Sequence, residues 1–372
     1  SICGAGTVGA SVIRILEQFS DRFTVACVLV RNIRKPRSFD TKKYRLTTNP
    51  QDVLADDVDI VVEVMGGTDL AKNIIEIALN AGKRVVTANK ALLFQQPQFM
   101  DHPLLRYEAS VCGGIPIIRA LEKDFPFMVT GVVGIMNGTC NFILHAMESD
   151  KEYQGVLADA QSLGYAEADP TADVEGHDAF AKLSIVARLA FGADVRDALR
   201  IGISGVTSID VRQARNMGCV IRHVCEVSVH NGCVRASCMP AFCPSTHDLV
   251  VSGPKNAVMV NCDDHLNILL QGEGAGGIPT ANSVVSDILD EYPKSPPTKH
   301  HDDDNLPLDK KIVSAFYVRI HTEKNIVNVL GACKFRVASI TTVGGGFCLV
   351  TGDNTPHDAL PANAAFTARI IQ

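Results

Sequence analysis

The first hundred residues alternate between short apolar runs and amphipathic segments. A glycine-rich turn leads into the periodic segment 7–19, and the apolar runs FTVACVLV (23–30), VDIVVEVMG (58–66) and RVVTANK (84–90) are separated by further helical patterns. Continuous apolar strands that alternate with helices are typical of a parallel sheet covered on both faces. The pattern predicts an α/β fold, a doubly wound Rossmann sheet that binds a dinucleotide, in residues 1–111.

The pattern changes in the middle of the chain. The long helical pattern of residues 177–192 is followed by segments 220–242 and 257–272, which alternate and turn like antiparallel strands. This predicts an α+β substrate and dimerisation domain over residues 112–290. We expect a helix near 280–292 to pack back on the dinucleotide-binding domain.

Prolines and charges predict a linker over residues 291–312. Residues 313–372 contain short strand patterns around weak helical ones, which predicts a small C-terminal βαββ unit. At the other end, only three residues precede Gly4, fewer than a first strand usually has. We therefore expect further residues before Ser1.

Composition and charge narrow the classes of function. Hydrophobic residues make up 46% of the chain and charged residues 20%, which is typical of a globular protein. The net charge is −6, and no dense run of Lys and Arg suits nucleic acid. No apolar stretch is long enough to cross a bilayer. We expect a cytoplasmic protein without nucleic-acid or membrane partners, and organelle targeting stays open.

The twelve cysteines favour a reducing compartment, because they lie within apolar segments and never form CxxC. Most are expected to be small buried hydrophobic side chains. One alternative is a zinc site formed by Cys233, Cys238 and Cys243, which are spaced five apart near His223 and His230. That regular spacing does not match the usual paired zinc ligands.

The turn GAGTVG contains Gly4, Gly6, Thr7, Val8 and Gly9. In a dinucleotide site the first glycine permits the turn and the second lets the backbone approach the pyrophosphate. The third lets helix pack against strand. The motif alone also fits a structural turn, but its place between an apolar strand and an amphipathic helix favours a cofactor site.

The end of the second apolar run indicates which cofactor binds. An NAD site usually has Asp or Glu there, whereas this chain has Arg31, with Arg34 and Lys35 nearby. These cations suit a 2′-phosphate, so we expect NADP rather than NAD. The alternative is a solvated basic loop.

Residues 164–183 combine an acidic loop with the start of a buried helix. Five carboxylates fall within twelve residues, and Pro170 and Gly176 prevent the first part from being one helix. The five are Glu167, Asp169, Asp173, Glu175 and Asp178. Such a loop suits an ammonium group.

Asp178 and Lys182 are four residues apart, so their side chains share one helix face and can pair. On a solvated face this is an ordinary surface salt bridge. The apolar residues after Lys182 favour a buried pair instead, and a buried lysine beside carboxylates suits proton transfer to a hydroxyl. Lys90 closes the apolar run 84–90, where a parallel sheet places ligands, although a solvent-capping lysine is the alternative.

Seven segments, in order and spacing, resemble homoserine dehydrogenases over about residues 1–290. They are GAGTVG (4–9), EVMGG (63–67), TANKALL (87–93), YEASVCGGIPII (107–118), GIMNGTCNFIL (134–144), GYAEADPTADVEGHDAFAKL (164–183) and GEGAGGIPTANSVVSDI (272–288). The resemblance implies NAD(P)H-dependent, reversible reduction of L-aspartate 4-semialdehyde to L-homoserine, in threonine and methionine biosynthesis.

The resemblance also implies roles for single residues. Lys182 looks like the proton donor to the carbonyl oxygen, assisted by Lys90, and both lysines with Asp178 form the expected catalytic set. The substrate is expected on Glu167, Asp173, Asp178, Tyr165, Gly138 and Thr139. The cofactor is expected on the glycine turn and on Arg31, Thr87, Lys90, Gly164, Glu273 and Gly274. The backbone at Glu108, Val111, Gly113 and Ile115 is expected to coordinate sodium, as in some family members.

Family members are commonly dimers, so a homodimer or homotetramer is expected, and many carry a regulatory ACT domain where this chain has residues 313–372. Two departures from the family pattern are the missing glycine turn in that ACT-like unit and a histidine, His223, where lysine is common. Two rival interpretations stay open: a dehydrogenase of another amino acid or aldehyde, and a catalytically silent NADP(H)-binding regulator.

Overall fold

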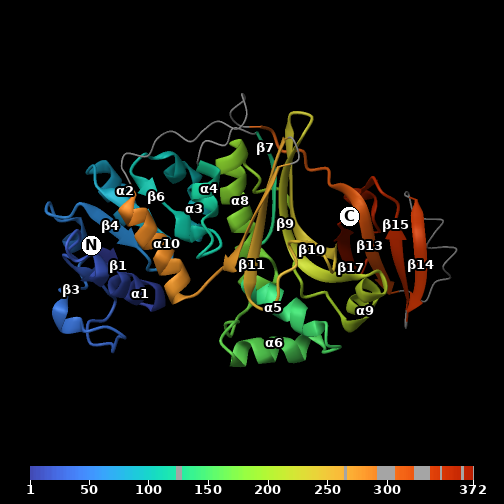
Figure 1. The fold of residues 1–372 in the computed structure, drawn as a ribbon, viewed down its shortest axis with the longest axis horizontal. Coiled ribbons are helices and arrows are strands. Elements are labelled where there is room, and N and C mark those ends of the chain that lie inside the picture. Colours follow the sequence, from blue (N-terminus) through green and yellow to red (C-terminus); the bar gives the residue numbers. More distant parts are fainter. Residues whose placement is uncertain are drawn as a thin grey trace. The chain divides into compact units, whose positions relative to one another are not determined.

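The computed structural model describes residues 1–122, 128–263, 266–290, 306–321, 336–343, 346–361 and 364–371 (Figure 1). The chain forms two compact units. The first is built from residues within 1–126, 184–190 and 272–300, and the second from residues within 127–183, 191–271 and 301–372.

The sheet of the first unit has six strands in the order β3-β2-β1-β4-β5-β6, and every neighbouring pair is parallel. The strands are β1 Ile2–Cys3, β2 Val28–Leu29, β3 Leu46–Thr47, β4 Ile60–Glu63, β5 Arg84–Thr87 and β6 Leu105–Arg106. The chain crosses over at β1, so β1 and β4 form the switch point where doubly wound sheets bind ligands. The predicted Rossmann sheet is confirmed.

The first unit also contains helices, of which the first two and the last pack against this sheet. They are α1 Thr7–Leu16, α2 Asp69–Asn80, α3 Lys90–Gln95, α4 Ile117–Glu122 and α10 Gly277–Leu289, with the 3-10 turns η1 Glu17–Phe19, η2 Thr41–Lys43, η3 Pro50–Leu54, η4 Pro97–Asp101 and η5 Glu108–Ser110. Helix α10 packs against α1 (Figure 1). A Cβ atom on Gly277 would lie 2.8 Å from Ser11 Oγ, so the close approach of the two helices requires glycine there.

The second unit contains an eleven-stranded mixed sheet. Nine strands run in the order β12-β11-β7-β9-β10-β17-β13-β15-β14, while β8 pairs with β10 and β16 with β13. The strands are β7 Val129–Ile135, β8 Leu199–Arg200, β9 Cys219–His230, β10 Cys233–Pro244, β11 Lys255–Cys262, β12 Asn267–Glu273, β13 Val313–His321, β14 Val337–Val343, β15 Gly346–Thr351, β16 Thr355–Pro356 and β17 Phe366–Ile370.

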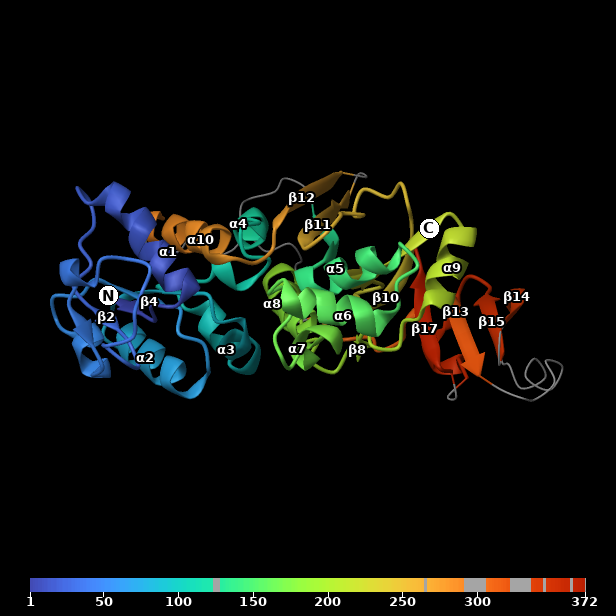
Figure 2. The same cartoon turned by 90° about the horizontal axis from the view of Figure 1, so that it is seen from below.

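The remaining helices are α5 Gly138–Met147, α6 Tyr153–Ser162, α7 Thr171–Val174, α8 His177–Phe191 and α9 Ser208–Asn216, with the 3-10 turn η7 His357–Ala359 (Figure 2). Helices α5 and α9 contact β9 of this sheet, and residues 184–190 of α8 belong to the first unit. Helix α5 contacts β9 and β11 on one side and α6 on the other. Its buried residues Ile143 and Leu144 belong to a core shared with Phe242 and Tyr317.

The C-terminal strands continue the central sheet. Strand β17 pairs in parallel with β10, through Ala241 opposite Arg369, and β13 pairs with β17. The predicted linker over 291–312 is described only from residue 306. Residues 322–335, where the first helix of the βαββ unit is expected, also lie outside the described residues. The ACT-like assignment therefore stays a prediction.

Two expectations about composition can be compared with the structure. In the part of the chain that is described, no helix is long and apolar enough to cross a membrane. All eleven described cysteines are free thiols, and most are buried.

The alternative of a zinc site at Cys233, Cys238 and Cys243 is not supported. All three lie on β10, where a spacing of five places Cys238 on the opposite face from the other two. Cys233 and Cys243 are separated by about 33 Å of extended strand. Among the described residues, no cluster of three His, Cys, Asp or Glu side chains is arranged to hold a metal ion.

Candidate active site

The glycine turn opens onto a cavity of about 1140 Å³ at the β1 and β4 ends of the first sheet. Gly4 has φ +106°, and a Cβ atom on Gly9 would lie 2.0 Å from the Gly4 carbonyl oxygen. A Cβ atom on Gly6, in contrast, would have nothing within 4 Å, and Gly6 lines the cavity together with Thr7. Two glycines therefore allow α1 to pack, and the third leaves space for a phosphate group.

The far side of this cavity is basic. Arg31, Lys35 and Arg37 line it together with Asn32. The Arg37 guanidinium donates to the carbonyl oxygens of Ile33 (3.2 Å), Lys35 (2.7 Å) and Asn32 (2.7 Å), so it holds the loop after β2 in shape. Sequence reasoning singled out Arg31 and missed Arg37, because a loop-organising role depends on carbonyl positions that no residue pattern shows.

A buried network joins the loops that follow β4 and β5. The Glu63 carboxylate, fully buried, accepts the Thr87 hydroxyl (2.7 Å) and the Met65 N–H (2.8 Å). The Asn89 N–H donates to Thr87 Oγ1 at 3.1 Å, and the Asn89 side chain donates to the Gly67 carbonyl at 2.7 Å. Burial raises the pKa of Glu63, opposed by these hydrogen bonds. Sequence reasoning did not identify Glu63 or Asn89.

Lys90 does not end the fifth strand, as the apolar run suggested. Strand β5 ends at Thr87, and Lys90 is the first residue of α3. The Asn89 side chain caps this helix by accepting the Leu92 N–H at 3.1 Å. Lys90 therefore projects from a capped helix start whose backbone is tied to β4 through Glu63 and Thr87.

The acidic segment of the second unit is interrupted as Pro170 and Gly176 predicted. Helix α7 begins after Pro170 and ends at Val174, and Gly176, with φ +76°, turns the chain into α8. His223 packs beneath this turn: its Nε2 lies 2.9 Å from the Ile201 carbonyl oxygen. A Cβ atom on Gly176 would lie 3.0 Å from the His223 ring. His223 thus supports the turn from the side of β9.

The predicted pair of Asp178 and Lys182 is present and buried. Lys182 Nζ lies 2.8 Å from Asp178 Oδ2, and their side chains are only 9% and 12% exposed. The ammonium also donates to the Met136 carbonyl at 2.8 Å. This excludes the alternative of an ordinary solvated surface salt bridge, since both partners are largely withdrawn from water.

A second carboxylate is held beside this pair. The Asn137 side-chain amide donates to Asp173 Oδ1 at 2.7 Å and to Asp178 Oδ2 at 2.9 Å. Burial raises the pKa of Asp173, with Asp178 adding in the same direction and the Asn137 hydrogen bond opposing it. The loop therefore presents the half-buried Asp173 carboxyl group close to the Lys182 ammonium.

The remaining predicted substrate residues lie on the same unit but are more exposed. Thr139, near the start of α5, donates its hydroxyl to the Tyr165 carbonyl at 2.7 Å. The Tyr165 ring is 43% exposed and its centroid lies 4.7 Å from that of Phe142. Gly138 begins α5, and a Cβ atom there would lie 2.5 Å from the Pro254 carbonyl oxygen. Glu167 is exposed.

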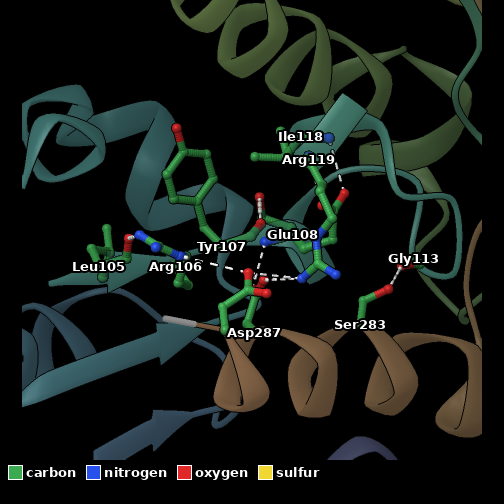
Figure 3. Close-up of polar contacts among 11 residues, drawn as sticks. Leu105, Arg106, Tyr107, Glu108, Gly113, Ile118, Arg119, Ser283 and Asp287 are labelled. Atoms are coloured by element: carbon green, nitrogen blue, oxygen red, sulfur yellow. Dashed lines mark hydrogen bonds and ion pairs between the residues drawn. The ribbon is translucent and has the colours of Figure 1, made fainter. Parts of the chain in front are cut away.

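The predicted sodium loop follows β6 (Figure 3). The buried Glu108 carboxylate accepts the N–H groups of Ile118 (2.9 Å) and Arg119 (2.7 Å), and burial raises its pKa to about 7. The Glu108 N–H donates to Asp287 of α10 at 2.8 Å. Ser283, one turn earlier on α10, donates its hydroxyl to the Gly113 carbonyl at 2.7 Å.

The other predicted cofactor residues are distributed over both units. Val8, Gly9, Thr87, Lys90, Glu273 and Gly274 belong to the first unit but do not line the cavity described above. Gly274 is buried against Gly113, whose added Cβ atom would lie 2.6 Å from the Gly274 carbonyl oxygen. Gly164 belongs to the second unit, where it is exposed after α6 with φ +78°.

With this geometry in place, comparisons with known proteins decide the family. The family model "Homoserine dehydrogenase" matches residues 116–289, and "Homoserine dehydrogenase, NAD binding domain" matches residues 4–101. The homoserine dehydrogenase of Mycobacterium leprae is 42% identical over 312 residues, which are 78% of this chain and 71% of that protein. The chain belongs to the homoserine dehydrogenase family.

Solved structures of the homoserine dehydrogenase family agree with this. The enzyme from Thiobacillus denitrificans superposes with a TM-score of 0.87 at 30% identity, over 100% of this chain and 97% of that one. A hyperthermophilic archaeal homoserine dehydrogenase mutant in complex with NADPH has a TM-score of 0.67 at 25% identity, over 78% of this chain and 95% of that one. The protein is accordingly an NAD(P)-dependent oxidoreductase of amino-acid biosynthesis that interconverts L-aspartate 4-semialdehyde and L-homoserine.

Proposed function

We propose that Lys182 is the acid and base of this reaction. The observation that carries the proposal is its geometry: a lysine almost withdrawn from water, held by Asp178 and by the Met136 carbonyl. In the reducing direction its ammonium donates a proton to the carbonyl oxygen as negative charge grows there. In the oxidising direction the neutral amine accepts the proton of the homoserine hydroxyl, so oxidation is favoured at alkaline pH. Lys90 is proposed as the second lysine because of the family resemblance.

The acidic loop is proposed to bind the amino acid. Glu167 and Asp173 supply negative charge for the substrate ammonium, and Asp178 orients Lys182 toward the reacting oxygen. Carboxylates with charge-assisted hydrogen bonds bind ammonium groups well. Gly138, Thr139 and Tyr165 are proposed to line this pocket, supported by the hydrogen bond from the Thr139 hydroxyl to the Tyr165 carbonyl.

NADP is proposed as the preferred cofactor. The free space at Gly6 suits a pyrophosphate at the start of α1, with Gly4, Thr7, Val8 and Gly9 forming the turn. Arg31 and Lys35 supply cations for a 2′-phosphate, on a loop that Arg37 holds in shape. Thr87, Lys90, Gly164, Glu273 and Gly274 are further proposed cofactor contacts. When bound, the reduced cofactor supplies the hydride.

A sodium ion is proposed to bind the carbonyl oxygens of Glu108, Val111, Gly113 and Ile115. Cys112 and Gly113 both have positive φ, 54° and 52°, so the backbone turns tightly between these carbonyls. The carbonyl of Gly113 accepts one hydrogen bond from Ser283, and that of Ile115 accepts one from the Ile117 N–H at 2.9 Å. Each retains a second lone pair for a cation.

A homodimer or homotetramer is proposed, assembled through the substrate domain of residues 112–290, with 313–372 as an ACT-like unit and 1–111 as the cofactor domain. The support is the resemblance to the family together with the broad sheet of the second unit. The solution mass of the purified protein, measured by light scattering, tests this assembly.

The test of the proposal follows absorbance at 340 nm with L-homoserine and either NADP or NAD, in sodium or choline salts. Lys182→Ala is compared with Lys151→Ala, which removes an exposed lysine paired with Asp159 at 3.3 Å. We expect Lys182→Ala to lower kcat at least 100-fold, within the usual range for a general base, and Lys151→Ala to leave it unchanged. Full activity of Lys182→Ala contradicts the assigned role, and equal kcat/KM with both cofactors contradicts the NADP preference.

A further inference from the structure

Asn137 makes three hydrogen bonds with one side chain at the start of α5. Its Oδ1 accepts the Cys140 N–H at 2.7 Å, which caps the helix. Its Nδ2 donates one hydrogen to Asp173 Oδ1 at 2.7 Å and the other to Asp178 Oδ2 at 2.9 Å. The residue is only 4% exposed, so every polar atom of its side chain has a protein partner inside the unit.

The preceding residue, Met136, holds the lysine of the same site. The carbonyl oxygen of Met136 accepts from Lys182 Nζ at 2.8 Å, and Lys182 Nζ lies 2.8 Å from the Asp178 oxygen that also accepts from Asn137. Two consecutive residues directly after β7 therefore hold both the ammonium and its carboxylate partner. Asn137 also holds Asp173. The backbone at these two residues therefore sets the distance between the Asp173 carboxylate, which is proposed to bind the substrate, and Lys182.

We propose that Asn137 is a positioning residue for the reaction, one that orients Asp173 and Asp178 with a single amide while capping α5. The proposal rests on the roles assigned above to Lys182, Asp173 and Asp178. Only an amide satisfies all three bonds, since Asp has the acceptor but no donor and Ser has one donor at most.

The two N–H donors of the Asn137 amide matter most when Lys182 is neutral. When Lys182 loses a proton it becomes neutral, and the negative charges of Asp173 and Asp178 then lie close together without its compensation. The Asn137 amide is a fixed donor to both carboxylates and needs no reorganisation during the step. Its loss should therefore disturb both geometry and pH dependence.

The test compares Asn137→Ser and Asn137→Asp with Asn231→Asp. Ser and Asp both keep an oxygen acceptor that caps α5, but Asp has no donor and Ser has only one, so neither can hold both carboxylates as the Asn137 amide does. Asn231 lies in the exposed turn between β9 and β10, so its substitution makes the same amide-to-carboxylate change far along the chain from the site residues. NADP(H) binding by fluorescence and the far-UV circular dichroism spectrum establish that each variant is folded.

We expect Asn137→Ser to lower kcat for homoserine oxidation by about 100-fold, the size of effect that misplaced reacting groups produce. Its KM for homoserine should rise, and its KM for NADP should not. The acid limb of its rate profile should move to higher pH, because Asp173 and Asp178 without the second donor stabilise the Lys182 ammonium more strongly, and oxidation needs the neutral amine. Asn137→Asp should shift the whole profile further upward by about one pH unit, since it adds a negative charge beside Lys182.

The outcomes separate this proposal from the proposed function. If Lys182→Ala is inactive while Asn137→Ser keeps kcat within about twofold of wild type, the positioning role is overturned and the role of Lys182 stands. A lower kcat with an unshifted acid limb also overturns it, since a merely structural change lowers the amount of competent enzyme without moving a titration. If Lys182→Ala is fully active, the proposed function fails, whatever Asn137 does.

Discussion

Lys182 carries a buried positive charge, and single atoms of two neighbouring residues stabilise it. A buried ammonium costs several kcal/mol unless its hydrogen-bond partners replace water. Asp178 supplies the opposite charge, and the Met136 carbonyl supplies a further acceptor. The two partners come from α8 itself and from the residue that follows β7, so the side chain is held in one direction. A lysine held in this way is already oriented before the substrate arrives.

Asp173 differs from Lys182, because its charge destabilises the folded state. Because burial raises its pKa, the folded state keeps this proton to a higher pH than the unfolded state does. The contribution of the neutral form to stability is therefore present below the unfolded value of 3.8 and is lost as pH rises through the raised folded value. The proposed role of Asp173, which is to bind the substrate ammonium, requires this charge.

Asp173→Asn should therefore separate stability from activity. The new amide oxygen still accepts from Asn137, while the buried charge is gone. We expect the variant to be more stable than wild type at pH 8, by about 1 kcal/mol, and the advantage to shrink toward pH 4. Its KM for homoserine should rise at least tenfold, as expected for a lost charge-assisted contact. Denaturant unfolding at both pH values, with steady-state kinetics, checks this; a variant that is less stable at pH 8 contradicts it.

At the scale of elements, Gly6 and Gly9 have different roles in the turn between β1 and α1. Gly9→Ala places a Cβ atom 2.0 Å from the Gly4 carbonyl oxygen, so α1 has to move away from β1. Gly6→Ala meets nothing within 4 Å, and Gly6 has φ −80°, which alanine adopts freely. The added methyl group instead enters the cavity where a pyrophosphate would lie.

We expect Gly6→Ala to keep the thermal unfolding midpoint within about 2 °C of wild type and to raise the Kd for NADP at least tenfold. Gly9→Ala should lower both the midpoint and the affinity. Differential scanning fluorimetry and cofactor titration measure the two quantities on the same samples. If Gly6→Ala binds NADP normally, the cavity is not the pyrophosphate site.

The elements of the first unit were predictable because their signals are local. Apolar runs of β-branched residues and an amphipathic helix indicate a parallel sheet, and GAGTVG indicates its ligand-binding turn. Asp178 and Lys182 were predictable from their spacing on one helix. Asn137 was not, because a helix cap looks the same in sequence whether or not its amide reaches two carboxylates 36 and 41 residues away. Glu63 was missed because its hydrogen bond with Thr87, 24 residues away, leaves no mark in the sequence pattern.

At the scale of the whole molecule, sequence patterns suggested a separate C-terminal unit, whereas the described strands continue the central sheet. A buried charge also links these strands to α9. Asp210 of α9 is fully buried and accepts from Tyr317 Oη and Arg319 Nε of β13, both at 2.9 Å. Its other oxygen accepts from the Thr207 N–H at 2.8 Å. Residues before and after the predicted linker thus complete one hydrogen-bonding network.

Arg319→Ala should consequently destabilise the second unit rather than release a regulatory domain. Removing one partner of a buried ion pair leaves an uncompensated charge and costs about 3–5 kcal/mol. The matched control is Arg196→Ala, which breaks an ion pair with Asp194 whose side chains are 48% and 53% exposed. That change should cost less than about 1 kcal/mol.

Denaturant unfolding measures the stability of both variants. The kcat per folded molecule should stay unchanged in each, because neither arginine belongs to the proposed proton-transfer site. An Arg319→Ala protein as stable as the control would contradict a stabilising role of the buried Arg319–Asp210 ion pair.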